Sequence, residues 1–214
     1  MLTLLQDLLQ RIYSIELGAS VEDFVITDRR LATLLAGSLG PGPEQLLVRE
    51  ESGTLEMSLF LDPGLLEPFG ERAGPEALQG DNLNAFCTLV EGVSHFVYLF
   101  RRASRDQEVT QLELELQAEV DKFAVLGLLL KAQRSGTLPA WLPRRLFEEV
   151  RFRAGLPAEA LDRYRHANRL AHRYCERLRR RFAWAWNGAD FVAELRRFYR
   201  MGQPQKLRHI RSAA

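Results

Sequence analysis

From residue 82 onward, apolar side chains recur at helical spacing for nearly the rest of this 214-residue chain. This periodicity restricts most of the chain to a bundle of helices. The first two helices are separated by a short break near residue 104, so we expect them to form an antiparallel helical hairpin. Residues 202–214 are predicted to be a basic tail with little to bury. The predicted helices cover about 82–103, about 106–133, about 143–153, 157–186 and 189–200.

The N-terminal part has a different pattern, in which a pair of strands is clearest. Within residues 54–61, Leu and Met alternate with Thr, Glu and Ser, and residues 44–50 precede them across a short Glu-Ser-Gly turn. We therefore expect a β-hairpin with one covered face. An isolated hairpin is marginal in water, and an amphipathic helix predicted at the N-terminus, ending near Gly18, is the obvious element to cover it. Residues 23–28 are a further strand candidate, and residues 29–36 a short helix.

These patterns together predict an α+β, predominantly helical fold. Residues 1–80 would form a small element of helix plus β-hairpin, and residues 81–214 a helical bundle with a long basic helix and a basic C-terminal third. Residues 68–80, which are rich in Pro and Gly, are predicted to link the two.

Composition indicates a cytoplasmic globular protein. Apolar residues make up 46% and charged residues 27%, and the two cysteines stand among apolar neighbours, as reduced thiols do. The most apolar run, residues 123–130, is far shorter than the roughly 20 residues of a membrane span, so we expect no membrane partner. The sequence has no phosphate-binding Gly-rich loop, no zinc-type cysteine pair and no nucleophile elbow, which makes an enzyme less expected.

Charge is divided unequally along the chain. Residues 1–143 carry 11 Lys and Arg against 21 Asp and Glu, net −10, whereas residues 144–214 carry 18 against 7, net +11. All but one of those 18 are Arg, which makes planar, bidentate contacts to phosphates and carboxylates. We expect a non-enzymatic adaptor that binds an acidic protein surface or nucleic acid. The alternative is that the two parts neutralise each other, within one chain or in a homo-oligomer.

Six arginines of the helix predicted over 157–186 are the candidate binding residues. At spacings of three and four they form a ridge that repels itself unless something negative lies along it. A solvated face, partly neutralised by Glu176 and Asp162, is the structural alternative. Five aromatic residues could stack on bases beside the ridge, although a core role is more typical. The arginines are Arg165, Arg169, Arg173, Arg177, Arg180 and Arg181, and the aromatic residues are Trp184, Trp186, Phe191, Phe198 and Tyr199.

Arg165 and His172 lie seven positions apart on this helix, about 20° from eclipsed. The spacing resembles the pattern of HEPN ribonucleases, in which an Arg and a polar residue are followed, after four to six residues, by a His. The resemblance implies a metal-independent ribonuclease in which His172 moves the proton of an RNA 2′-hydroxyl and Arg165 stabilises the phosphorane charge. It covers only this motif, and the all-helical HEPN fold does not require the predicted β-hairpin. The ribonuclease is therefore the alternative function.

Glu91 and His95 on the first predicted helix can be matched with Glu115 and Glu119 on the second. In a hairpin centred near residue 105, opposing positions sum to about 210, as 95 with 115 and 91 with 119 do, which suggests a carboxylate–histidine metal site. However, Glu91 and His95 lie about 140° and 180° from the centre of the apolar stripe of their helix. Glu119 instead lies within the stripe of its own helix. Packing of the stripes would keep the four side chains apart, so we expect no metal and no cofactor.

The same geometry predicts the surroundings of two of these residues. Glu91 and His95 are expected on a polar outer face of their helix. Glu119, a carboxylate on an apolar stripe, needs a partner, and one of the C-terminal arginines is expected to supply it.

Overall fold

The computed structural model of the chain describes residues 1–69, 82–133, 138–150, 152, 155–182 and 188–212, with the backbone alone at 131–133. The helices are α1 (Leu2–Tyr13), α2 (Arg29–Ala36), α3 (Asn82–Ala103), α4 (Gln111–Gln133), α5 (Trp141–Pro143), α6 (Ala158–Arg181), α7 (Ala189–Arg200) and α8 (Gln203–Arg211). The strands are β1 (Val25–Ile26), β2 (Glu44–Glu51) and β3 (Thr54–Leu61). Short helical turns are η1 (Val21–Phe24), η2 (Pro63–Leu65), η3 (Glu67–Phe69) and the π-helical η5 (Arg144–Glu148). The predominantly helical α+β class is confirmed.

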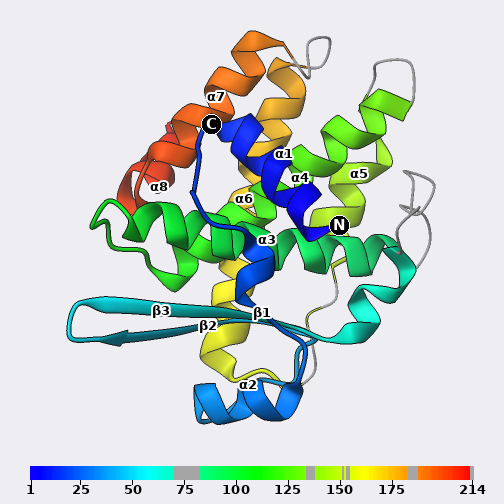
Figure 1. Cartoon of the computed structure of the whole chain (residues 1–214). Helices are drawn as coiled ribbons and strands as arrows, with labels where there is room; N and C mark the ends of the chain where they lie inside the picture. The colour runs from blue at the N-terminus through cyan, green and yellow to red at the C-terminus, as the bar shows by residue number, and fades with distance from the viewer. Residues whose placement is uncertain (70–81, 134–137, 151, 153–154, 183–187, 213–214) are drawn as a thin grey trace.

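The three-stranded sheet lies between α2 and α3 (Figure 1). Its order is β1-β3-β2, and the predicted hairpin is confirmed, with β2 and β3 antiparallel and Leu46 opposite Leu59. Alternation along the strands sends Leu46 and Leu59 to the main core, whereas Leu47 and Phe60 form a small second cluster with Ala32 of α2. Both faces of the sheet are therefore covered, and β2 is an edge strand.

The N-terminal helix does not cover the hairpin, contrary to the sequence-based prediction. α2 and α3 occupy the faces of the sheet, and α1 packs instead against α3 and α7. Tyr13 at the end of α1 stacks on Tyr199 of α7 with ring centroids 3.9 Å apart. α1 also ends earlier than the predicted Gly18, because Ser14 adopts a left-handed conformation with φ of 53°.

The central pair of helices, α3 and α4, are neighbours in the core, and α4 also packs along α6. α4 begins at Gln111 rather than near residue 106. Just before its first residue, Thr110 Oγ1 accepts a hydrogen bond from the Glu113 amide at 3.1 Å and so caps the helix. Among the described residues, α3 is the helix long and apolar enough to cross a membrane, but 61% of that stretch is buried inside the fold. Such burial is also typical of the core helix of a globular protein.

The C-terminal residues form helix α8, which buries Lys206 and Ile210, rather than the predicted basic tail with little to bury. Lys206 is fully buried, and its Nζ donates to the Tyr98 hydroxyl at 2.9 Å and to Gln117 Oε1 at 2.7 Å. Burial lowers the pKa of Lys206 to about 7. The prediction was wrong because the partners of Lys206 lie on α3 and α4, about ninety residues or more away in sequence.

Two further predictions meet the structure only in part. The helix predicted over 143–153 is shorter in the structure, because α5 continues into η5 and η5 ends at Glu148. Most of the predicted linker, residues 70–80, lies outside the described residues, as do Trp184 and Trp186.

Candidate metal centre

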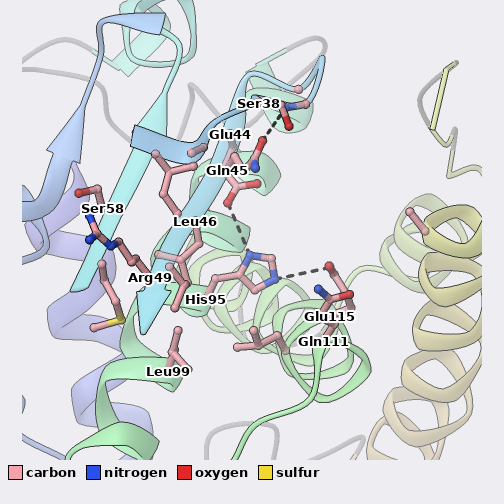
Figure 2. Close-up of a pocket in the computed structure, with 18 of the residues that line it drawn as sticks. Ser38, Glu44, Gln45, Leu46, Arg49, Ser58, His95, Leu99, Gln111 and Glu115 are labelled. Atoms are coloured by element: carbon pink, nitrogen blue, oxygen red, sulfur yellow. Dashed lines mark hydrogen bonds and ion pairs between the residues drawn. The ribbon is translucent and has the colours of Figure 1, made fainter. Parts of the chain in front are cut away.

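His95 on α3 is buried between a strand and a helix, with a carboxylate at each ring nitrogen (Figure 2). Its Nδ1 lies 3.5 Å from Oε1 of Glu44 on β2, and its Nε2 lies 3.5 Å from Oε2 of Glu115 on α4. The side chains of His95 and Glu44 are only 9% and 7% exposed. Both distances exceed those of good N–H···O hydrogen bonds, and within the described residues neither His95 Nε2 nor Glu44 Oε1 has a hydrogen-bond partner. Buried polar atoms of this kind call for a further group.

Glu91, one helical turn before His95, brings a third donor to the same point. Glu91, His95 and Glu115 each offer one ligand atom, and these atoms lie within 4.8 Å of one another. Ligands held about 2.1 Å from one tetrahedral ion are about 3.4 Å apart. Side-chain shifts of about 1 Å would therefore let one ion contact all three.

Lys122 on α4 pairs with Glu91. Its Nζ donates to Glu91 Oε2 at 3.0 Å and to Glu119 Oε1 at 2.8 Å. Burial opposes the charge of Lys122, but Glu119 and Glu91 together raise its pKa well above the usual value. The partner of Glu119 is thus Lys122 on the same helix rather than a C-terminal arginine, and that prediction was wrong.

The predicted separation of these side chains was also wrong, because α3 has no polar outer face at this point. The exposure of His95 is 7%. A side chain at Gly92 would place its Cβ 2.9 Å from Glu44 Cγ and 3.2 Å from Leu59 Cδ1. The missing side chain lets β2 and β3 approach α3 on the face that carries His95, while α4 packs on a neighbouring face. Different faces of one helix are therefore buried by different partners.

The charges around His95 favour its protonated form, so a metal ion at Nε2 would have to displace that proton. Burial by itself lowers the pKa of His95, but Glu115 and Glu44 raise it well above the usual value. Burial raises the pKa of Glu44, against the opposing effect of His95. The imidazole is thus held between two carboxylates, one of which, Glu115, belongs to the set of three converging donors.

His95, Glu44 and Glu115 open into a groove of about 730 Å³ that also runs along β2 (Figure 2). The first turns of α6 contribute Arg163 and Tyr164 to its wall. Burial raises the pKa of Tyr164, and Glu115, Glu91 and Glu44 raise it further, which places this ring near the three carboxylates. A ligand in the groove could therefore reach the converging donors.

No family model matches the chain, and neither a curated protein nor a solved structure matches it. The interpretation of the site depends on the chemistry of its own residues.

The six candidate arginines of α6 fall into two groups. Arg165, Arg169 and Arg173 are exposed, and the nearest carboxylate partner found among the described residues is Asp162, 3.8 Å from Arg165. The others make contacts within the chain. Arg177 donates to the His209 carbonyl and lies 3.7 Å from Glu194, Arg180 lies 3.0 Å from Glu176, and Arg181 stacks on Phe182.

The two residues of the ribonuclease pattern have separate local partners. His172 stacks on Phe147 with ring centroids 5.3 Å apart, and its Nε2 lies 3.9 Å from Glu148. Arg165 lies near Asp162. Neither His172 nor Arg165 lines the groove.

The aromatic residues after α6 that the structure describes belong to the core, as the more typical role predicted. Phe191 and Phe198 are fully buried, and Tyr199 is 4% exposed. These three are therefore closed to base stacking in this conformation.

Proposed function

We propose that this protein binds one divalent transition-metal ion through Glu91, His95 and Glu115. The observation that carries the proposal is the convergence of these three donors within 4.8 Å, two of which, His95 and Glu115, line an open groove. Glu44 would act from outside the coordination shell. Its Oε1 lies 3.5 Å from Nδ1 and after a small shift would accept from Nδ1–H, which leaves Nε2 of His95 for the ion, as in carboxylate–histidine–metal arrangements.

The donor set favours particular ions. One imidazole with two carboxylates suits Zn²⁺, Mn²⁺ or Fe²⁺ rather than Ca²⁺, which prefers six or more oxygen ligands. Three protein ligands also leave coordination positions for water or a small molecule, which is typical of reactive rather than purely structural sites. Lys122 neutralises part of the excess negative charge and keeps Glu91 oriented.

Titration of the chelator-treated protein with Zn²⁺ and Mn²⁺ by calorimetry tests the proposal. We expect one saturable site per chain, with Zn²⁺ bound more tightly than Mn²⁺. His95→Ala and Glu115→Gln should each weaken binding by at least about 100-fold, because each removes one of three ligands. His172→Ala is the matched control, since this histidine lies on α6 outside the groove.

Two results would contradict the proposal. One is the absence of saturable binding to the folded wild-type protein. The other is equal affinity in the wild type, His95→Ala and Glu115→Gln, which would indicate adventitious surface binding.

A second candidate function is binding of an acidic protein partner or nucleic acid by the exposed face of α6. Arg165, Arg169 and Arg173 favour it, because they are exposed and follow one another at four-residue intervals, about 6 Å along the helix axis. A row of cations with so little neutralisation attracts a polyanion.

Fluorescence anisotropy with labelled RNA and duplex DNA, across a salt series, tests the exposed row. We expect binding that weakens steeply with salt and is lost when Arg165, Arg169 and Arg173 are changed to Glu. Arg177 is left unchanged because its bond to the His209 carbonyl anchors α8. No binding at low salt would exclude nucleic acid and leave an acidic protein partner or charge neutralisation within the protein as the role of the row.

The ribonuclease alternative requires cleavage as well as binding. Under it, His172→Ala should abolish RNA cleavage and leave RNA binding nearly intact. Equal loss of binding and cleavage would exclude this role for His172.

A further inference from the structure

We infer that the groove takes a small carboxylate ligand with an apolar tail, whose carboxylate binds the metal ion and Arg163. The inference rests on the proposed metal site. It goes further by assigning the chemical class of the molecule that occupies the positions left open on the ion.

Part of the wall beside the metal ligands is apolar, although Gln45, Arg49 and Gln111 also line the groove. Leu99 lies one helical turn after His95 on α3, and Leu46 lies on the same face of β2 as Glu44. Leu114 precedes Glu115 on α4. All three line the groove, and Figure 2 places Leu46 and Leu99 beside the His95 ring. An apolar cavity with a few convergent polar groups at one end is typical of small-molecule sites.

Arg163 supplies a cation for the head of the ligand. It lines the groove beside Tyr164, and its guanidinium lies 5.8 Å from the centre of that ring. The Nε atom of Arg163 is buried and has no hydrogen-bond partner in the described part of the chain. No carboxylate of the described residues lies within 4 Å of the Arg163 guanidinium. A buried guanidinium nitrogen without a partner is costly, and a carboxylate ligand would satisfy it with two parallel hydrogen bonds.

Pairing within the described chain leaves Arg163 without a direct partner. Glu91 and Glu115 would neutralise a divalent ion, and Lys122 pairs with both Glu91 and Glu119. Glu44 lies 3.5 Å from Nδ1 of His95. Arg163 lines the groove, and no carboxylate of the described chain lies at ion-pair distance from it. A ligand carboxylate would supply the missing partner of Arg163.

Calorimetry with acetate, octanoate and 1-octanol on the zinc-loaded protein tests the inference. Zinc binding is measured first, so that failure of the metal site is seen separately. Octanoate should bind at least about 30-fold more tightly than acetate, because each methylene removed from water contributes up to about fourfold. It should also bind at least about tenfold more tightly than 1-octanol, which has the tail without the charge.

Two changes test whether zinc and Arg163 recognise the ligand carboxylate. Arg163→Gln, and omission of zinc, should each lower octanoate affinity about tenfold, and Arg163→Gln should leave zinc affinity unchanged. Arg165→Gln is the matched control, because this exposed arginine of the same helix does not line the groove.

The outcomes are distinct. If zinc binds but octanoate binds no better than acetate, the tail site is wrong and the metal site stands. If octanol equals octanoate, or if neither zinc nor Arg163 affects octanoate, recognition of the carboxylate is wrong. If zinc does not bind at all, the proposed function fails and the carboxylate ligand fails with it.

Discussion

Asp121→Ala should lower the free energy of unfolding by about 4 kcal/mol. Asp121 is buried on α4, and its carboxylate accepts hydrogen bonds from the hydroxyls of Tyr13 and Ser94 and from the amide of Gln117 at 2.8 Å. One side chain thus joins α1, α3 and α4. Its removal leaves the buried hydroxyls of Tyr13 and Ser94 without their acceptor, each at a cost of about 1–3 kcal/mol that is not fully additive, and Gln117 keeps only its bond to the Tyr13 hydroxyl. Chemical denaturation of the two proteins measures the difference.

Asp121→Asn is the matched control. The amide oxygen can still accept from Tyr13 and Gln117, and the amide nitrogen can donate to Ser94, so we expect a loss of only about 1 kcal/mol. Equal losses in the Ala and Asn variants would contradict the role given to the hydrogen bonds and point to the charge instead.

The pH dependence of stability separates the charge of Asp121 from its hydrogen bonds. Burial raises its pKa to about 6, against the opposing effect of its three donors, from a usual value of 3.8. The folded protein therefore binds more protons than the unfolded chain between about pH 4 and pH 6. The contribution of Asp121 to stability is present below pH 4 and is lost as the pH rises through 6, with a slope of up to about 1.4 kcal/mol per pH unit. The stability difference between wild type and Asp121→Asn should follow that slope.

Elements with local signals could be predicted almost to the residue. The helix at 29–36 follows Asp28, whose carboxylate accepts from the amides of Arg30 and Leu31. The strands at 44–51 and 54–61 flank a turn in which Ser52 and Gly53 have positive φ, as the short Glu-Ser-Gly sequence favours. Caps and turns depend on neighbouring residues, so the sequence specifies them directly.

Elements that depend on distant partners could not be predicted this way. α8 has a strongly polar sequence, and its burial depends on Lys206 reaching Tyr98 and Gln117 on other helices. No periodicity within residues 202–214 signals that contact. For the same reason, the sequence predicted that α1 covers the β-hairpin, whereas α2 and α3 cover it in the structure.

At the proposed metal site, the register of the helical hairpin was predicted correctly, but convergence of the side chains was wrongly rejected. The expected register of the helical hairpin pairs residue 95 with 115 and 91 with 119, and the structure places His95 at Glu115 while Lys122 joins Glu91 to Glu119. The rejection assumed that only apolar stripes pack. Glu44 had no signal at all, because its role depends on the approach of β2 to α3. Gly92, between Glu91 and His95 inside a helix, was the available sign of that approach.

Gly92→Ala should weaken metal binding by about 10- to 100-fold while changing stability little. The new Cβ would lie 2.9 Å from Glu44 Cγ, which is too close, so the Glu44 side chain must move away from His95 Nδ1. Loss of an outer carboxylate from a ligating histidine typically costs 10- to 100-fold in affinity. Alanine favours the helix by about 1 kcal/mol over glycine, which offsets the crowding. Zinc titration and denaturation of the same variant measure both effects.

A double-mutant cycle with Glu44→Gln distinguishes displacement of Glu44 from general damage. Glu44→Gln alone should weaken zinc binding to a similar extent, because the neutral amide is a poorer acceptor for Nδ1–H. Adding Gly92→Ala to Glu44→Gln should then cause little further loss, since both changes act on one contact. Additive losses would mean that Leu59, whose Cδ1 would lie 3.2 Å from the new Cβ, moves instead and shifts the sheet away from α3. Glycine at position 92 would in that case position the whole sheet rather than one carboxylate.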